Sequence, residues 1–129
     1  MALSNLVNQL KATLEFDPSS ESGCGMYGLI GKMITTPGSR DAFIAILMEG
    51  IKEMPGCLSY VVAKDPTDLS GIWITEVWDS EASHSASLSL PAVKDTIARG
   101  RDMIAGFGER YVTAPVGGYG LAGGAKRTS

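Results

Sequence analysis

The chain has 129 residues, of which 44% are hydrophobic and 19% charged, which is the length and composition of one globular domain. Its formal net charge of −3 leaves no basic surplus to neutralise phosphates, so neither nucleic acid nor an anionic membrane is an expected partner. The sequence contains no apolar run of the roughly 20 residues that cross a membrane, and its N-terminus lacks the pattern of a secretion signal. Two cysteines are too few for a disulfide framework, so we expect a reducing, cytoplasmic setting.

The first 25 residues are expected to form an extension to the main domain. Residues 2–15 predict an amphipathic helix, because five apolar residues recur at helical spacing: Leu3, Leu6, Val7, Leu10 and Leu14. Asp17 and Pro18 end this pattern, and a Ser-rich linker follows. We therefore expect a helical extension with its linker over 1–25, a main domain over 26–115 and a Gly-rich tail over 116–129.

The main domain begins with a strand over 26–36 and a helix over 40–54, separated by a Pro-Gly break. The predicted buried stripe of this helix consists of Phe43, Leu47, Ile51 and Met54. Two strands follow over 57–64 and 71–78. The turn residues between these strands predict a hairpin.

The second half of the domain predicts a short helix over 80–89, a further helix from Pro91 and a final strand over 107–116. One side of the further helix is expected to carry Val93, Ile97 and Ile104. One face of the final strand is expected to carry Phe107, Glu109, Tyr111 and Thr113. The order β-α-β-β-α-β is typical of the ferredoxin-like α+β fold, one antiparallel sheet with its helices on one face. The opposite face then needs a cover, which predicts a homodimer.

The strand over 71–78 carries the most informative residues for function. Strand alternation places Ile74, Glu76 and Trp78 on one face. A carboxylate in mid-strand must reach solvent or find a partner, because burying it alone is costly. If this face lines a cavity, Glu76 and Trp78 form an aromatic pocket with one ionisable group, which suits an aromatic substrate.

His84 is the single histidine of the chain, and two interpretations of it remain open. It is either an exposed residue of a short helix or a proton donor and acceptor at the rim of a pocket. A metal site with Asp79 and Glu81 is not expected, because these ligands are too few. Two G-x-G-x-x-G matches, at 23–28 and 118–123, do not join a strand to a helix, so we expect no dinucleotide cofactor.

Four short segments of the main domain form a pattern together: 36–38 (TPG), 54–60 (MPGCLSY), 75–82 (TEVWDSEA) and 87–93 (SLSLPAV). In this order and spacing they resemble the antibiotic biosynthesis monooxygenase superfamily of dimeric α/β barrels, over about residues 27–114. The resemblance implies a homodimer that inserts oxygen into a quinol, an anthrone or a related electron-rich aromatic or polyketide substrate. Molecular oxygen would be the co-substrate, with no metal, flavin or haem.

The resemblance also suggests roles for three residues. Trp78 falls where anthrone-oxidising members carry a tryptophan in their site, and His84 falls near their site tyrosine. In this hypothesis Trp78 stacks on the substrate ring, His84 exchanges the phenolic proton, and Glu76 assists or orients.

Some residues differ from the pattern of the superfamily. The anthrone-oxidising and haem-degrading branches use an asparagine, and no asparagine follows Asn8 in this chain. Gly31 stands where the haem-degrading branch has its asparagine, and residues 91–105 contain no histidine, so haem degradation is not expected. The alternative hypothesis is a small-molecule-binding or structural dimer on the same scaffold.

Overall fold

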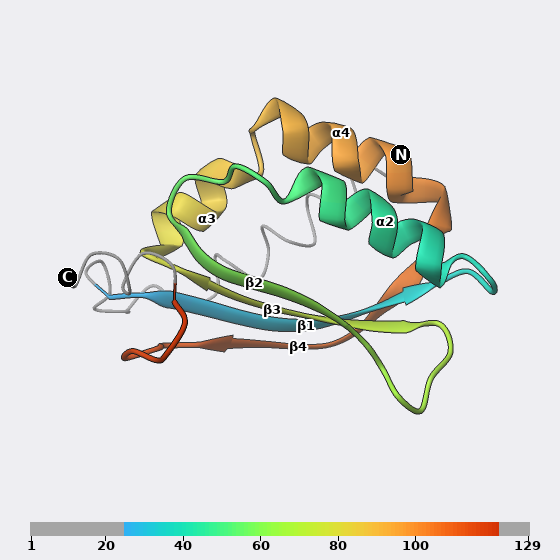
Figure 1. Ribbon diagram of the computed structural model, residues 1–129, viewed down its shortest axis with the longest axis horizontal. Helices are drawn as coiled ribbons and strands as arrows, with labels where there is room; N and C mark the ends of the chain where they lie inside the picture. Colours follow the sequence, from blue (N-terminus) through green and yellow to red (C-terminus); the bar gives the residue numbers. More distant parts are fainter. Residues whose placement is uncertain (1–24, 122–129) are drawn as a thin grey trace.

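The computed structural model describes residues 25–121, which form an antiparallel four-stranded sheet with α-helices over one of its faces (Figure 1). The elements in chain order are β1 (Tyr27–Thr35), α2 (Arg40–Gly50), β2 (Cys57–Lys64), β3 (Gly71–Trp78), α3 (Glu81–Ser87), α4 (Pro91–Gly100), the 3₁₀ helix η1 (Arg101–Met103) and β4 (Ile104–Thr113). The strand order is β2-β3-β1-β4, so the predicted ferredoxin-like α+β class is confirmed. The helix predicted over 2–15 and the end of the Gly-rich tail lie outside the described residues.

The predicted hairpin of β2 and β3 is confirmed with the expected bounds. Helix α2 is shorter than predicted, because it ends at Gly50 and not at residue 54. Glycine is a poor helix former, and a Cβ at this position would collide with the Thr96 hydroxyl of α4. The close approach of the two helices therefore requires glycine at the point where α2 stops.

Strand β4 differs from its prediction in both position and alternation. It begins at Ile104, three residues before the predicted start, so this residue is not on the preceding helix. From Phe107 to Arg110 the strand advances by three residues, whereas the paired segment of β1 advances by two. The extra residue in β4 forms a β-bulge. Phe107 and Arg110 consequently line the helix-covered side, whereas Tyr111 pairs with Ile30 on the opposite side. The prediction that Phe107 and Tyr111 share a face is wrong for this reason.

The core lies between the sheet and the helices and is divided into two clusters. One consists of Phe43, Leu47, Ile72 and Ile74, and the other of Tyr27, Leu29 and Trp78. The alternation predicted for β3 is confirmed, since Ile74 and Trp78 are both buried on the helix-covered side. The two clusters bury the inner face of the sheet at its two ends, with a cavity between them.

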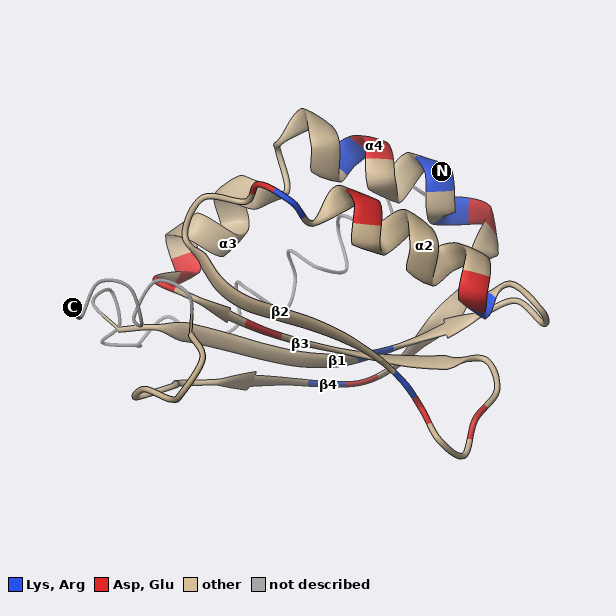
Figure 2. Cartoon of the chain, in the orientation of Figure 1, with Lys and Arg blue, Asp and Glu red and all other residues tan. Residues whose placement is uncertain are grey.

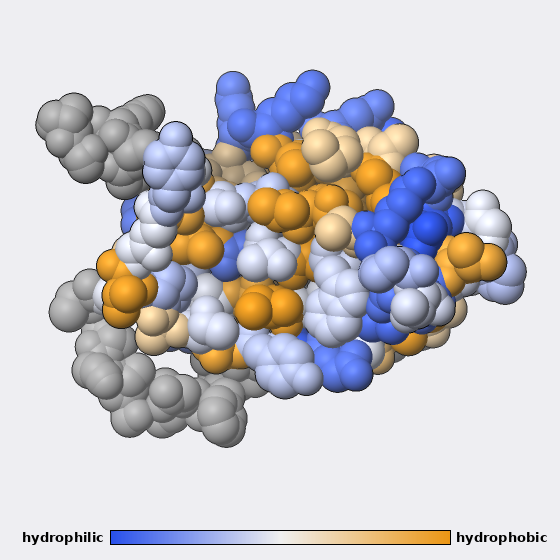
Figure 3. All heavy atoms as spheres, turned by 60° about the horizontal axis from the view of Figure 1, so that its bottom comes forward, coloured by the Kyte–Doolittle hydropathy of each residue, from blue (hydrophilic) through white to orange (hydrophobic). Residues whose placement is uncertain are grey.

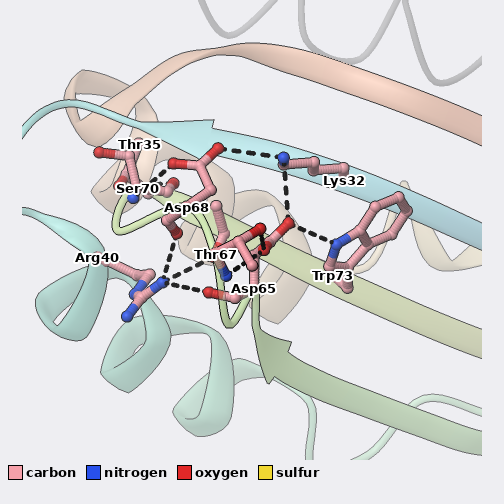
Figure 4. A network of polar contacts seen from close by, with 9 residues as sticks. Lys32, Thr35, Arg40, Asp65, Thr67, Asp68, Ser70 and Trp73 are labelled. Carbon is pink, nitrogen blue, oxygen red and sulfur yellow. Dashed lines mark hydrogen bonds and ion pairs between the residues drawn. The ribbon is translucent and has the colours of Figure 1, made fainter.

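The turn of the β2–β3 hairpin is fixed by a polar network that also holds the start of α2 (Figure 4). The Arg40 guanidinium donates to three hairpin carbonyl oxygens, those of Asp65, Asp68 and Gly71. The Lys32 ammonium lies 3.1 Å from the carboxylates of both Asp65 and Asp68. The indole N–H of Trp73 donates to Asp65 at 3.0 Å. We infer a structural role for this network, because the charges in it are paired with one another.

The uncovered face of the sheet is apolar across its middle, as the view from that side shows (Figure 3). Strand alternation and register place Ile30, Val61, Val77 and Tyr111 on this face. Val61 and Tyr111 are 52% and 54% exposed, which is high for side chains of this kind in a sheet. Charged residues gather instead on α2, α4 and the hairpin (Figure 2). Among the described residues no helix is long and apolar enough to cross a membrane.

Candidate active site

A cavity of about 120 Å³ lies between the inner face of the sheet and the helices. Most of its wall is apolar and includes Phe43, Leu47, Met54, Ile97 and Phe107. Its volume is close to the roughly 150 Å³ of a cavity known to hold one benzene molecule. The cavity therefore has room for one aromatic ring and only small substituents.

Glu76 supplies a carboxyl group to this apolar wall. It projects from the middle of β3, and its side chain is only 13% exposed. The indole N–H of Trp78, two residues along the same face, donates to Glu76 Oε1 at 2.9 Å. Burial raises the pKa of Glu76 to about 7, although this hydrogen bond and the positive charge of Arg110 both oppose the rise. A carboxyl group with this pKa can give or take a proton at neutral pH.

His84 lies inside the fold, so the interpretation of it as an exposed residue is wrong. Ser80 begins α3 by accepting a hydrogen bond from the Ser83 backbone N–H, and the short helix then packs its His84 face onto the sheet. Only 3% of His84 is exposed. Its ring contacts the ring of Trp78 edge-on, with the centroids 5.3 Å apart, and lies at the same distance from the ring of Tyr27.

The structure thus brings together Glu76, Trp78 and His84, the three residues singled out in the sequence. His84 Nε2 is 3.7 Å from Glu76 Oε1, too long for a hydrogen bond but close enough for charge coupling. Burial lowers the pKa of His84 to about 4, and the positive charge of Arg110 acts in the same direction. At neutral pH the imidazole is therefore uncharged, and the group of this pair that titrates there is Glu76.

Two polar residues of the cavity wall were not identified as site residues from the sequence. Tyr60 extends from β2 beside Glu76, its cross-strand neighbour, and burial raises the pKa of its hydroxyl well above the usual value. Arg110 extends from β4. The sequence did not predict Arg110 in the site, because regular alternation without the bulge assigns its side chain to the other face of the sheet. The one signal was Gly31, a residue without a side chain directly opposite Arg110 in the sheet.

Two buried polar atoms near the cavity have no hydrogen-bond partner among the described residues: His84 Nδ1 and the Tyr27 hydroxyl. An unsatisfied buried group of this kind costs about 1–3 kcal/mol of stability. Of these two residues His84 lines the cavity, so a ligand oxygen that reaches its Nδ1 would relieve part of this cost. The site is consequently suited to a small ring with hydroxyl or carbonyl groups.

The residues available for metal binding or thiol chemistry are few. Within residues 25–121, no three or more histidine, cysteine, aspartate or glutamate side chains cluster in a way that could hold a metal ion. Burial raises the pKa of the Cys57 thiol to about 11, and the nearby charge of Glu76 adds to the rise. Cys57 is thus a neutral thiol at pH 7.

Comparison with known proteins gives one family and a set of similar folds. A family model described as antibiotic biosynthesis monooxygenase matches residues 26–99, more than half of the chain. A structure from Chloroflexus aurantiacus J-10-fl, provisionally named as an antibiotic biosynthesis monooxygenase, is 68% identical with a TM-score of 0.72, covering 74% of this chain and 98% of its own. No curated protein matches the sequence.

More distant structures share only the fold. PA3566 from Pseudomonas aeruginosa is 16% identical with a TM-score of 0.63, covering 72% of this chain and 96% of its own. A protein from Bacteroides thetaiotaomicron VPI-5482 is 19% identical with a TM-score of 0.65, covering 74% of this chain and 93% of its own.

Proposed function

Because the chain belongs to the antibiotic biosynthesis monooxygenase family, we propose that it oxidises a small electron-rich phenol with molecular oxygen and without a cofactor. The observation that carries this proposal is the carboxyl group of Glu76, with a pKa of about 7, in the wall of an apolar cavity of ring size. Such a group can remove a phenolic proton where water is largely excluded. The phenolate that results is a far better electron donor than the phenol.

The reaction balances with oxygen as the only co-substrate. A hydroquinone loses a phenolic proton to Glu76, and the phenolate passes one electron to oxygen. The superoxide and the ring radical combine to form a carbon–oxygen bond, which gives a ring hydroperoxide. The ring carbon then loses its proton and the O–O bond breaks, so one oxygen atom stays on the ring and the other leaves as water. The net reaction converts a hydroquinone and O₂ into a hydroxyquinone and water.

We assign the proton transfer to Glu76 and positioning roles to its two neighbours. Trp78 holds the carboxylate through the indole N–H and offers its ring to the substrate. His84, which is uncharged at neutral pH, closes the wall beside the carboxyl group. This assignment exchanges the roles that the sequence suggested for Glu76 and His84, because the pKa of Glu76 lies nearer neutrality.

The size of the cavity favours a one-ring quinol over a three-ring anthrone. A cavity of about 120 Å³ compares with the roughly 150 Å³ that accommodates one benzene molecule. Three fused rings would require α2 or α4 to move away from the sheet. We therefore expect substituted hydroquinones to react faster than anthrones.

Oxygen consumption tests the proposed function directly. The purified protein is mixed with a hydroquinone, a naphthohydroquinone and an anthrone in chelator-treated buffer, and oxygen uptake is followed with an electrode. We expect uptake above the rate without protein for the hydroquinone, and at least a hundredfold fall in kcat/KM for Glu76→Gln. The matched control is Glu49→Gln, since Glu49 is exposed on the outer side of α2.

Absence of uptake above the background rate with every substrate would overturn the proposal. The alternative hypothesis, a binding module without catalysis, then predicts that the same compounds quench tryptophan fluorescence and are recovered unchanged. Oxygen uptake that is equal in the wild type and Glu76→Gln would instead refute the assignment of Glu76.

We further propose that the chain is a homodimer, paired through the uncovered face of the sheet. The apolar side chains of this face (Ile30, Val61, Val77 and Tyr111) would be buried if two sheets packed at the usual separation of about 10 Å. A two-fold axis makes such an interface self-complementary, and we expect it to bury more than roughly 2,000 Å². Light scattering at micromolar concentration should give twice the chain mass of 13.5 kDa. A compact monomer would refute this pairing.

A further inference from the structure

Arg110 is the one positively charged side chain among the described residues that line the cavity. It extends from β4 over the inner face of the sheet, and its partner in the register of β1 is Gly31. On the other side of β1, Gly31 is opposite Ile74 of β3, and Glu76 is the next inward-facing residue of that strand. Arg110 and Glu76 are thus diagonal neighbours on the same face, separated by the width of β1.

The missing side chain of Gly31 leaves the space that Arg110 occupies. A Cβ built on Gly31 would lie 3.3 Å from Arg110 Nη1 and 3.9 Å from Arg110 Cγ. The guanidinium group therefore lies against the backbone of β1, where any larger residue would have placed a side chain. In this position its charge acts on Glu76, Tyr27 and Tyr60, which come from the three other strands.

At neutral pH most of the titratable groups around the cavity are uncharged. Burial keeps Tyr27, Tyr60 and Cys57 protonated, and it keeps His84 uncharged. Helices α2 and α4 contribute apolar side chains, Gly50 and Thr96 to the wall. One cation, Arg110, and one titrating carboxyl group, that of Glu76, remain.

When Glu76 takes the phenolic proton, the negative charge moves from the carboxylate to the substrate oxygen, and the total charge of the cavity stays the same. A nearby fixed cation favours either position of that negative charge. The cation therefore stabilises the phenolate as it stabilises the carboxylate before the proton transfer.

We propose that Arg110 is the counter-ion of the bound phenolate and that Gly31 provides the gap through which the guanidinium group reaches it. The proposal rests on the proposed function only in taking the ligand to be a phenol. It also sets a specificity: the cavity selects ring compounds whose hydroxyl group ionises readily, and it disfavours their methyl ethers.

The test uses 4-nitrophenol, because its phenol and phenolate forms differ in absorbance and no turnover is needed. The probe is titrated with the full-length protein at a series of pH values, and the pKa of the bound probe is compared with that of the free probe. We expect the bound pKa to be lower than the free pKa in the wild type. In Arg110→Met it should rise by at least about one unit, a tenfold loss of phenolate at a given pH.

Three further variants make the comparison specific. Arg110→Lys should keep most of the effect, because it keeps the charge. Gly31→Val should lose much of it although the arginine is still present, because the new side chain occupies the position of the guanidinium group. The matched controls are Arg99→Met on the exposed side of α4 and Gly106→Val, where an added Cβ meets nothing within 4 Å.

The outcomes separate this proposal from the proposed function. Three results would overturn the role of Arg110, whatever the oxygen uptake. The pKa of the bound probe could equal that of the free probe in the wild type, or it could be the same in all variants. The third such result is that the probe does not bind at all. A lowered pKa that depends on Arg110 and Gly31 would support the role even if no quinol is oxidised. If Arg110→Met does not fold, Gly31→Val and Arg110→Lys still decide the question.

Discussion

Burial shifts the pKa values of Glu76 and His84 in opposite directions, and this predicts an unusual dependence of stability on pH. The pKa of Glu76 rises from 4.5 to about 7 and that of His84 falls from 6.5 to about 4, because the apolar surroundings disfavour the charged form of each group. Each shift of one unit corresponds to about 1.36 kcal/mol of stability. The two groups therefore affect the free energy of unfolding with opposite signs.

The signs follow from proton binding. The folded chain holds the proton of Glu76 more tightly than the unfolded chain, so the stability associated with Glu76 is complete below pH 4.5 and falls as the pH rises to about 7. The folded chain holds a proton on His84 less tightly, so the stability associated with His84 is complete above pH 6.5 and falls as the pH drops to about 4. Between pH 4.5 and 6.5 each contribution changes by about 3 kcal/mol, and the two changes cancel.

Single substitutions should remove this cancellation. Relative to the wild type, Glu76→Gln should gain about 3 kcal/mol of stability as the pH rises from 4.5 to 6.5, because only His84 then titrates. His84→Asn should lose about 3 kcal/mol over the same range, because only Glu76 then titrates. The assay is urea unfolding followed by circular dichroism at pH 4.5, 5.5 and 6.5, with all three proteins at one concentration.

Titration of other carboxyl groups, or a change of oligomeric state with pH, affects the unfolding free energy of all three proteins alike. The test therefore compares the pH dependence of each variant with that of the wild type. Equal slopes in the three proteins would show that burial does not shift these pKa values. Slopes of reversed sign would mean that the folded chain stabilises the charged form of each remaining group. Either result would refute the assignment of Glu76 as the group that titrates near neutral pH.

Three further substitutions test the surroundings of the site and the frame that holds it. Trp78→Phe removes the hydrogen bond that lowers the pKa of Glu76, so the rise of kcat/KM with pH should move to higher pH. An unchanged pH profile would contradict this effect of Trp78 on Glu76. Gly50→Ala should destabilise the fold by about 1–3 kcal/mol in urea unfolding, because its methyl group collides with Thr96, and an unchanged midpoint would argue against this close approach. Hydrogen bonds hold the pKa of Asp65 well below its usual 3.8. As the pH falls below 3.8, the wild type should therefore lose more stability than Asp65→Asn. Parallel curves of unfolding free energy against pH would contradict this role of the network.

The parts of the fold that depend on local patterns were predictable from the sequence. Both strands of the hairpin were predicted with the right bounds, because β-branched residues alternate there and turn residues mark their ends. The shared face of Glu76 and Trp78 followed from the same alternation. Their hydrogen bond is consistent with that placement.

The features that were missed depend on contacts between distant segments. The burial of His84 is decided by how α3 docks on the sheet, which the seven residues of that helix do not encode by themselves. The position of Arg110 depends on the pairing of β4 with β1, and alternation within β4 alone gives the wrong face. The end of α2 at Gly50 depends on Thr96 of another helix.

The bulge in β4 makes the pairing register of this strand more important than its composition. If the residues after Phe107 paired with β1 without the bulge, every later side chain of the strand would turn to the opposite face. Arg110 would then lie on the apolar outer face, and Tyr111 would enter the cavity beside Glu76. Substitutions in this strand act on one face at a time, whereas a slip of one residue in its pairing would damage the pocket and the pairing surface together.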